Sequence, residues 1–201
     1  MFTPESFLPA LTGALSDITE PRDIRAKTVE ILAEARASAI GDIAAGFMSH
    51  PRAARETVRA IATLTDVTVT AIHHVATTIL HPRTNPTDAE RLAVLAIGGY
   101  GRAEMAPQSD VDLLFLTPWK VSGWAESVVE SMLYMLWDLK LKVGQSTRTI
   151  DDCLRLGAGD ITIRTSLLEH RLVCGHAATA ETLRDRLWSE LFDRSVPEFI
   201  E

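Results

Sequence analysis

The sequence has 201 residues, a formal net charge of −7, 46% hydrophobic residues and 23% charged residues. A chain of this size can bury a core without disulfides or structural metals, as one domain or as a catalytic domain with a helical companion. The acidic balance argues against a protein that grips nucleic-acid phosphates, although a bound metal ion can screen one triphosphate locally. We therefore expect no nucleic-acid partner.

The cysteines and the N-terminus indicate the cellular compartment. Cys153 and Cys174 have no paired spacing, which favours a reducing compartment over a disulfide framework or a zinc site. The first residues lack the basic start and apolar run of a signal peptide, and no segment has the apolar length that spans a bilayer. We expect a cytoplasmic protein that does not associate with membranes.

The N-terminal part of the sequence predicts helices. Residues 19–21 form a helix start with a proline, and apolar residues follow at helical spacing until about His50. A second helix is predicted over residues 52–80, although residues 67–70 alternate as a strand would. Residues 81–88 hold two prolines and several turn formers, which predicts a linker.

The character of the sequence changes after residue 90. A short, continuous apolar run at residues 92–97 predicts a buried strand that ends at Gly98 and Gly99. Residues 102–105 fit one helical turn, which the proline at position 107 would stop. The glycine pair is thus expected to end a strand and to precede a helical turn.

Strands and helices are predicted for the remainder of the chain. We expect a second strand at residues 111–117, an amphipathic helix at 124–140, a polar edge strand at 142–149 and helices to the end. Three glycines would break the last helices: Gly157, Gly159 and Gly175. These elements predict an α+β fold, a small mixed sheet flanked by helices, with a helical N-terminal region over residues 1–85 and a second domain over 86–201.

The most informative segment combines a glycine pair with two aspartates. Gly98 and Gly99 lack Cβ atoms, so the backbone can approach a ligand closely, and amides at the following helix start can face a phosphate, with Ser109 as a further donor. Asp110 and Asp112 lie two apart on a predicted strand and therefore share one face. Converging carboxylates repel each other unless a cation lies between them, and Mg²⁺ prefers such oxygen ligands together with substrate phosphates. Either feature alone is commonly a turn or a solvated strand end, but this order indicates a phosphate cradle followed by a metal pair.

The same segment resembles the signature of the polymerase-β nucleotidyltransferase superfamily. The resemblance rests on Gly-Gly at 98–99, Gly-Arg-x-Glu at 101–104 and Pro-x-Ser-Asp-x-Asp-Leu at 107–113. The fuller string is similar to the N-terminal part of bacterial bifunctional PII uridylyltransferase/uridylyl-removing enzymes. That likeness continues through residues 136–149 and covers about residues 90–175.

The resemblance implies a polymerase-β-like nucleotidyltransferase fold and a reaction. Enzymes of this family transfer UMP from UTP to a tyrosine of the PII nitrogen-signal protein and release pyrophosphate. Carried onto this chain, Asp110 and Asp112 would be the catalytic pair that holds Mg²⁺, and Gly98, Gly99 and Ser109 would bind the triphosphate. UTP and PII are thus the expected partners.

Two features of the site stay open in the sequence. Many superfamily members use a third carboxylate on a later strand, but residues 142–149 contain none, so Asp151, Asp152 and Glu169 are unranked candidates. Arg102 can contact a phosphate or orient an aspartate, or it can form a local ion pair that pins the loop.

Three other functions compete with uridylyl transfer. The first is adenylyl transfer to a related signal protein, because the motif does not select a base. The second is a nucleotide-binding regulatory module without catalysis. The third is an inactive fragment, because the resembling enzymes also carry a hydrolase domain and ligand-sensing domains that 201 residues do not hold. We accordingly expect uridylyl removal and glutamine sensing to be absent from this polypeptide.

Overall fold

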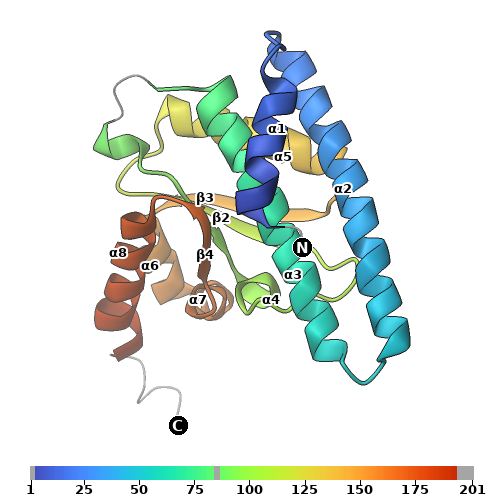
Figure 1. The fold of residues 1–201 in the computed structure, drawn as a ribbon. Helices are drawn as coiled ribbons and strands as arrows, with labels where there is room; N and C mark the ends of the chain where they lie inside the picture. The colour runs from blue at the N-terminus through green and yellow to red at the C-terminus, as the bar shows by residue number, and fades with distance from the viewer. Residues whose placement is uncertain (1–2, 84–86, 194–201) are drawn as a thin grey trace. The chain divides into compact units, whose positions relative to one another are not determined.

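A computed structural model describes residues 3–83 and 87–193 (Figure 1). The chain divides into two compact units, the first unit (Met1–Asn85, Ala103–Val111 and Ser127–Gly144) and the second unit (Pro86–Arg102, Asp112–Glu126 and Gln145–Glu201). The first unit thus combines the N-terminal helices with two later segments, and the predicted domain boundary at residue 85 stays a prediction. In the described part of the chain no helix is long and apolar enough to cross a membrane.

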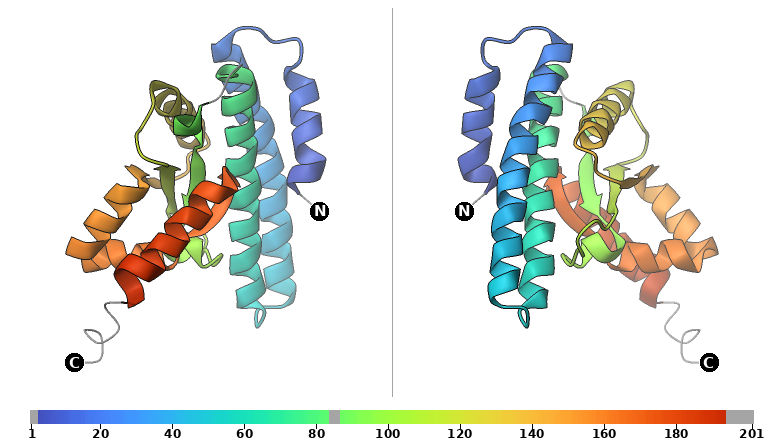
Figure 2. Two further views of the ribbon diagram at one scale, coloured as in Figure 1. Left: turned by 90° about the vertical axis from the view of Figure 1, so that its left-hand side faces the viewer. Right: turned by 90° about the vertical axis from the view of Figure 1, so that its right-hand side faces the viewer.

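Helices make up most of the first unit. They are α1 (Pro4–Leu15), α2 (Pro21–Ser49), α3 (Ala54–His74) and a π-helical turn, η1 (Val75–Leu80), that continues α3. The three α-helices lie side by side (Figure 2). Pro21 opens α2 because its fixed φ suits the first helical position and its missing N–H costs no bond there. Both long helices predicted from the sequence are confirmed, and part of the predicted linker, residues 84–86, lies outside the described residues.

The strand-like stretch at residues 67–70 is part of α3. Val67, Thr68 and Val69 are buried there, so packing inside the first unit outweighs the weak helix propensity of β-branched residues. The Thr68 hydroxyl donates to the Leu64 carbonyl, 2.7 Å away, and accepts from Arg36 of α2 at 2.8 Å. The threonine is therefore satisfied inside the helix, and the alternation was not evidence for a strand.

The four strands form one sheet in the order β3-β2-β1-β4. Their bounds are β1 Ala93–Ala96, β2 Val111–Thr117, β3 Val143–Thr149 and β4 Arg171–Gly175. β1 pairs antiparallel with both β2 and β4. β2 and β3 are joined by the helix α5 (Gly123–Asp138). The Val111 N–H donates to the Lys142 carbonyl at 2.8 Å, and the Thr117 hydroxyl donates to the Arg148 carbonyl at 3.5 Å. Both pairs have the same offset in sequence, which indicates that the two strands are parallel. The sheet is mixed and β3 lies at its edge, as predicted.

The second unit has its own hydrophobic core. Its helical elements are η2 (Asp88–Glu90), α4 (Gly98–Gly101), α6 (Ile150–Gly159), α7 (Ile161–Leu168), α8 (Ala177–Arg186) and η3 (Leu187–Phe192). Leu95 of β1 and Leu114 of β2 pack with Leu167 of α7 and Leu183 of α8 in one buried cluster. This packing holds the end of β1, which leads into α4, and the beginning of β2, which follows Asp110.

Two local predictions are wrong. The helical turn lies at Gly98–Gly101 instead of residues 102–105, so the glycine pair is inside the turn and not before it. The chain after residue 150 is not wholly helical, because β4 pairs with β1. Gly175 ends that strand with a φ of +92°. It packs on the Leu92 carbonyl so closely that a Cβ at this position would overlap the carbonyl oxygen.

Candidate active site

The site begins where β1 leads into α4. Ile97 is extended, and its N–H donates to the carbonyl of Asp112 at 3.1 Å, which ties the strand end to β2. Gly98 follows at φ +58°, a left-handed conformation that favours glycine. A Cβ on Gly98 would lie 3.6 Å from Asp112 Oδ2. The first residue of α4 therefore lies directly against the carboxylate of Asp112.

The two aspartates occupy the beginning of β2. Asp112 is half-buried and is flanked in the strand by the buried Val111 and Leu113. Asp110 is exposed and comes immediately before the strand. Since neighbouring side chains of a strand alternate between its faces, Asp112 lies on the face opposite Val111. One carboxylate is thus held by packing and the other is open to solvent.

The loop from α4 to β2 has strained backbone at two positions. Ala103 and Gln108 have φ values of +56° and +67°, which are unfavourable for residues with a Cβ. Within the first unit, the Met105 N–H donates to the Val58 carbonyl of α3 at 3.1 Å. Ser109 is exposed, and its N–H donates to the Ala106 carbonyl at 3.1 Å. The loop is thus held by its own turn and by α3.

Each candidate for a third carboxylate takes part in another interaction. Asp151 accepts from Arg186 at 2.6 Å. Asp152 accepts from Arg155 at 2.7 Å and from Thr149, and these hydrogen bonds lower the pKa of Asp152 to about 2. Within residues 3–83 and 87–193, no group of three or more His, Cys, Asp or Glu side chains is arranged to hold a metal ion. The described residues thus place no third carboxylate with Asp110 and Asp112.

Glu169, the third candidate, interacts with the residue that follows α4. Its carboxylate accepts from Arg102 Nη1 at 2.5 Å, and Glu169 is the less exposed partner of this ion pair. Arg102 therefore has a long-range ionic partner, 67 residues away in sequence. Sequence reasoning considered both residues separately and did not connect them, because no spacing signal links the end of α7 to α4.

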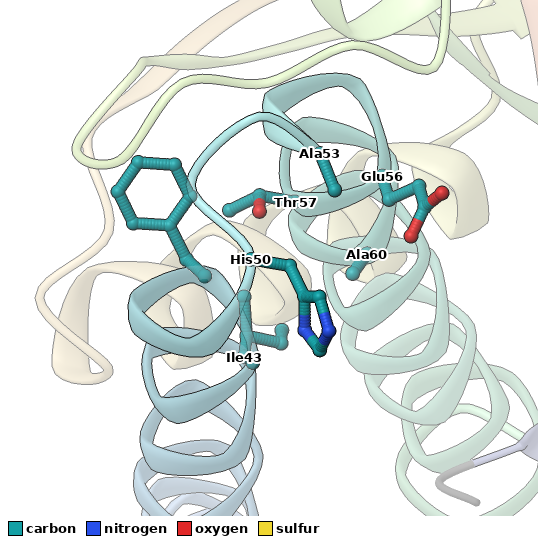
Figure 3. A pocket seen from close by; sticks show the side chains of 8 residues that line it. Ile43, His50, Ala53, Glu56, Thr57 and Ala60 are labelled. Atoms are coloured by element: carbon teal, nitrogen blue, oxygen red, sulfur yellow. The ribbon is translucent and has the colours of Figure 1, made fainter.

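The described part of the first unit contains an interhelical cavity and an apolar groove. One, of about 450 Å³, lies between the end of α2 and the beginning of α3, and Figure 3 shows the His50 ring directed between these helices. The other, of about 410 Å³, is an apolar groove that includes Phe47, Met48, Gln108 and Ser109. Neither is lined by an aspartate, so we place the candidate site at α4 and β2 instead.

Comparison with known proteins gives a family for the chain. The model of a family described as GlnE, glutamate-ammonia ligase adenylyltransferase, matches residues 6–147. A bifunctional uridylyltransferase/uridylyl-removing enzyme of Cereibacter sphaeroides is 59% identical over 182 residues, which are 90% of this chain and 20% of that protein. An enzyme of the same name from Ruegeria pomeroyi is 52% identical over 201 residues, which are 100% of this chain and 22% of that protein.

A more distant relative gives the same result. The bifunctional uridylyltransferase/uridylyl-removing enzyme of Rhodospirillum rubrum is 40% identical over 196 residues, 96% of this chain and 21% of that protein. The chain thus spans about a fifth of the length of the curated relatives it matches. Because the family model covers more than half of the chain, and the fold agrees, the chain belongs to the glutamate-ammonia ligase adenylyltransferase family of nucleotidyltransferase domains.

Proposed function

We propose that this chain is the nucleotidyl-transferring part of a uridylyltransferase, which moves UMP from UTP to a tyrosine of the PII nitrogen-signal protein and releases pyrophosphate. The observation that carries the proposal is the contact of Gly98 with the Asp112 carboxylate. It brings a close-approach backbone, suited to a phosphate, next to an oxygen ligand suited to a cation. The names of the relatives support UMP as the transferred group.

The carboxylate pair fits Mg²⁺. Asp110 and Asp112 supply hard oxygen donors, and Mg²⁺ is commonly held by one or two carboxylates together with substrate phosphates and water. A two-carboxylate donor set is therefore sufficient without a third from the described residues. When bound, Mg²⁺ would supply positive charge that stabilises the attacking and leaving oxygens of the transfer.

The protein's own residues would orient the substrates. The backbone of Gly98 and Gly99 would receive the triphosphate closely, with Ser109 as an additional hydroxyl donor and Arg102 as a nearby cation. The tyrosine oxygen would attack the α-phosphorus in line with the departing pyrophosphate. A P–O bond to tyrosine forms, the bond to pyrophosphate breaks, and the hydroxyl proton passes to water. Positioning is the main contribution that this arrangement makes to the rate.

A labelling assay tests the function. Purified protein is incubated with Mg²⁺ and each α-labelled nucleoside triphosphate in turn, with PII or with PII whose acceptor tyrosine is replaced by phenylalanine. We expect label on unmodified PII from UTP alone. Asp110→Asn and Asp112→Asn should reduce labelling at least 100-fold, on the order of the effect of removing one electrostatic contribution to the transition state.

The control variant is Asp185→Asn, which changes an exposed aspartate that pairs with Arg184 on α8. It should label PII at the wild-type rate. Full activity in both Asp110→Asn and Asp112→Asn would refute the site. If no nucleotide labels PII, calorimetry tests whether the protein still binds UTP in the presence of Mg²⁺. Binding would indicate a module that binds nucleotide without transfer, and no binding would show that the assignment is wrong. Labelling of PII by a full-length relative in the same assay would indicate that this part needs further domains for activity.

Adenylyl transfer is the second candidate, favoured by the description of the matched family as an adenylyltransferase. The same assay decides between the two, because label from ATP and none from UTP would replace the uridylyl assignment. The carboxylate pair and the glycine pair would keep their proposed roles in that case.

A further inference from the structure

The return of the chain from α7 into β4 brings a cation to the end of β1. In the antiparallel pairing of these strands, Arg171 is the partner of Ala96, the last residue of β1. Ile97 and Gly98 follow Ala96 directly in sequence. Arg171 is therefore fixed by strand pairing beside the point where α4 begins, and in Figure 1 α4 and α7 lie next to each other in the second unit.

Arg171 contacts Tyr100 in two ways. Its Nη2 donates to the Tyr100 carbonyl at 3.3 Å, and its guanidinium carbon lies 5.5 Å from the centroid of the Tyr100 ring. Tyr100 is only 1% exposed and Arg171 is half-buried, so the contact is partly shielded from water, which strengthens a cation–π interaction. One side chain thus holds both the backbone and the ring of the same residue.

The next two residues, Gly101 at the end of α4 and Arg102 directly after it, are held by Glu169. Gly101 packs so tightly on the Glu169 carbonyl that a Cβ there would overlap it, and Arg102 forms the ion pair with the Glu169 carboxylate. Three consecutive residues of the turn are therefore in contact with Glu169 and Arg171. A helix of four residues cannot hold itself, because nucleating one turn is unfavourable without outside contacts.

Resting on the proposed function, we propose that Arg171 is a positioning residue that clamps α4 and so sets the distance between the Gly98 backbone and the Asp112 carboxylate. The other end of the turn is fixed by the Ile97–Asp112 hydrogen bond, so the clamp at Tyr100 determines how the intervening glycines face a triphosphate. Arg171 acts through α4 and does not itself touch the nucleotide. Arg102 is correspondingly engaged with Glu169 as part of the same clamp.

Hydrogen exchange measures the clamp without any nucleotide. The amides of Gly101 and Arg102 donate to the carbonyls of Ile97 and Gly98 at 3.1 and 3.3 Å. In Arg171→Met these two amides should exchange about tenfold faster, as expected when a hydrogen bond to a charged group is lost. In Arg171→Lys, which keeps the charge but not the planar guanidinium, the exchange rates should lie between those of Arg171→Met and the wild type.

The matched control is Arg164→Met. Arg164 also donates to two carbonyls of the second unit, Gly157 and Ala158, at 2.8 and 2.9 Å, but at the end of α6. Its removal should leave the exchange of Gly101 and Arg102 unchanged. Slow exchange at Leu95 and Leu114, in the core, shows in each variant that the unit stays folded.

Calorimetry with UTP and Mg²⁺ then relates the clamp to the site. We expect about tenfold weaker UTP binding in Arg171→Met, partial recovery in Arg171→Lys and wild-type affinity in Arg164→Met. Unchanged exchange at Gly101 and Arg102, or wild-type UTP affinity in Arg171→Met, overturns the proposal. If the wild type itself binds no UTP, the proposed function fails, and the exchange data alone decide whether Arg171 clamps α4.

Discussion

At the scale of single residues, Gly101 is the position where the structure leaves no space for a side chain. An added Cβ would overlap the Glu169 carbonyl and lie 3.1 Å from the Ala96 carbonyl, and both neighbours are backbone atoms that cannot rotate away. We expect Gly101→Ala to lower the free energy of unfolding by about 1–3 kcal/mol, the usual cost of overpacking, and to weaken UTP binding because α4 must shift. Urea unfolding measures the first effect. Gly159→Ala, at an open position at the end of α6, is the control and should leave the free energy of unfolding unchanged. Equal stability of the two variants would contradict this geometry.

At the scale of elements, the beginning of α6 depends on a reciprocal cap. The Asp152 N–H donates to Thr149 Oγ1 at 3.1 Å, and the Asp152 carboxylate accepts from the Thr149 hydroxyl at 2.7 Å. Replacing Asp152 by Asn should cost about 1 kcal/mol of stability at pH 7, the typical value for a capping residue. Hydrogen bonds from Arg155 and Thr149 lower the pKa of Asp152 to about 2, so its contribution is complete above the ordinary pKa of 3.8 and is lost as the pH falls through about 2. The difference in stability between Asp152→Asn and the wild type, measured by thermal unfolding, should therefore shrink between pH 4 and pH 2. Asp151→Asn serves as the neighbouring control. A difference that stays constant with pH would contradict the cap.

Sequence patterns predicted the elements that carry their own signal. β2 was predicted at its observed bounds because its apolar run is closed by an aspartate and a proline. β4 was missed because a half-buried strand of five residues shows no clear alternation, and its assignment depends on pairing with β1. The register of α4 was missed because glycines are poor helix formers and packing alone holds the turn. Of the site, the order of the motif implied that Gly98 lies near Asp112, whereas the contact of Arg171 with Tyr100 joins residues 71 apart and leaves no local trace.

At the scale of the whole molecule, acid stability should depend on a histidine far from the site in sequence. Burial in α3, together with the charges of the nearby His74 and Arg83, lowers the pKa of His73 to about 4. Because the unfolded chain binds a proton near pH 6.5 and the folded protein does not, the stabilising contribution is complete above pH 6.5 and is lost as the pH falls towards 4. The free energy of unfolding should fall by about 2–3 kcal/mol over this window. In His73→Phe the slope between pH 6.5 and 4 should largely disappear, whereas His50→Phe, at an exposed position, should keep it. This window lies above the one in which Asp152 titrates, so denaturant unfolding at pH 7, 5, 4 and 2.5 separates the two groups. If the free energy of unfolding of His73→Phe changes with pH as it does in the wild type, the ring is not held neutral by the first unit.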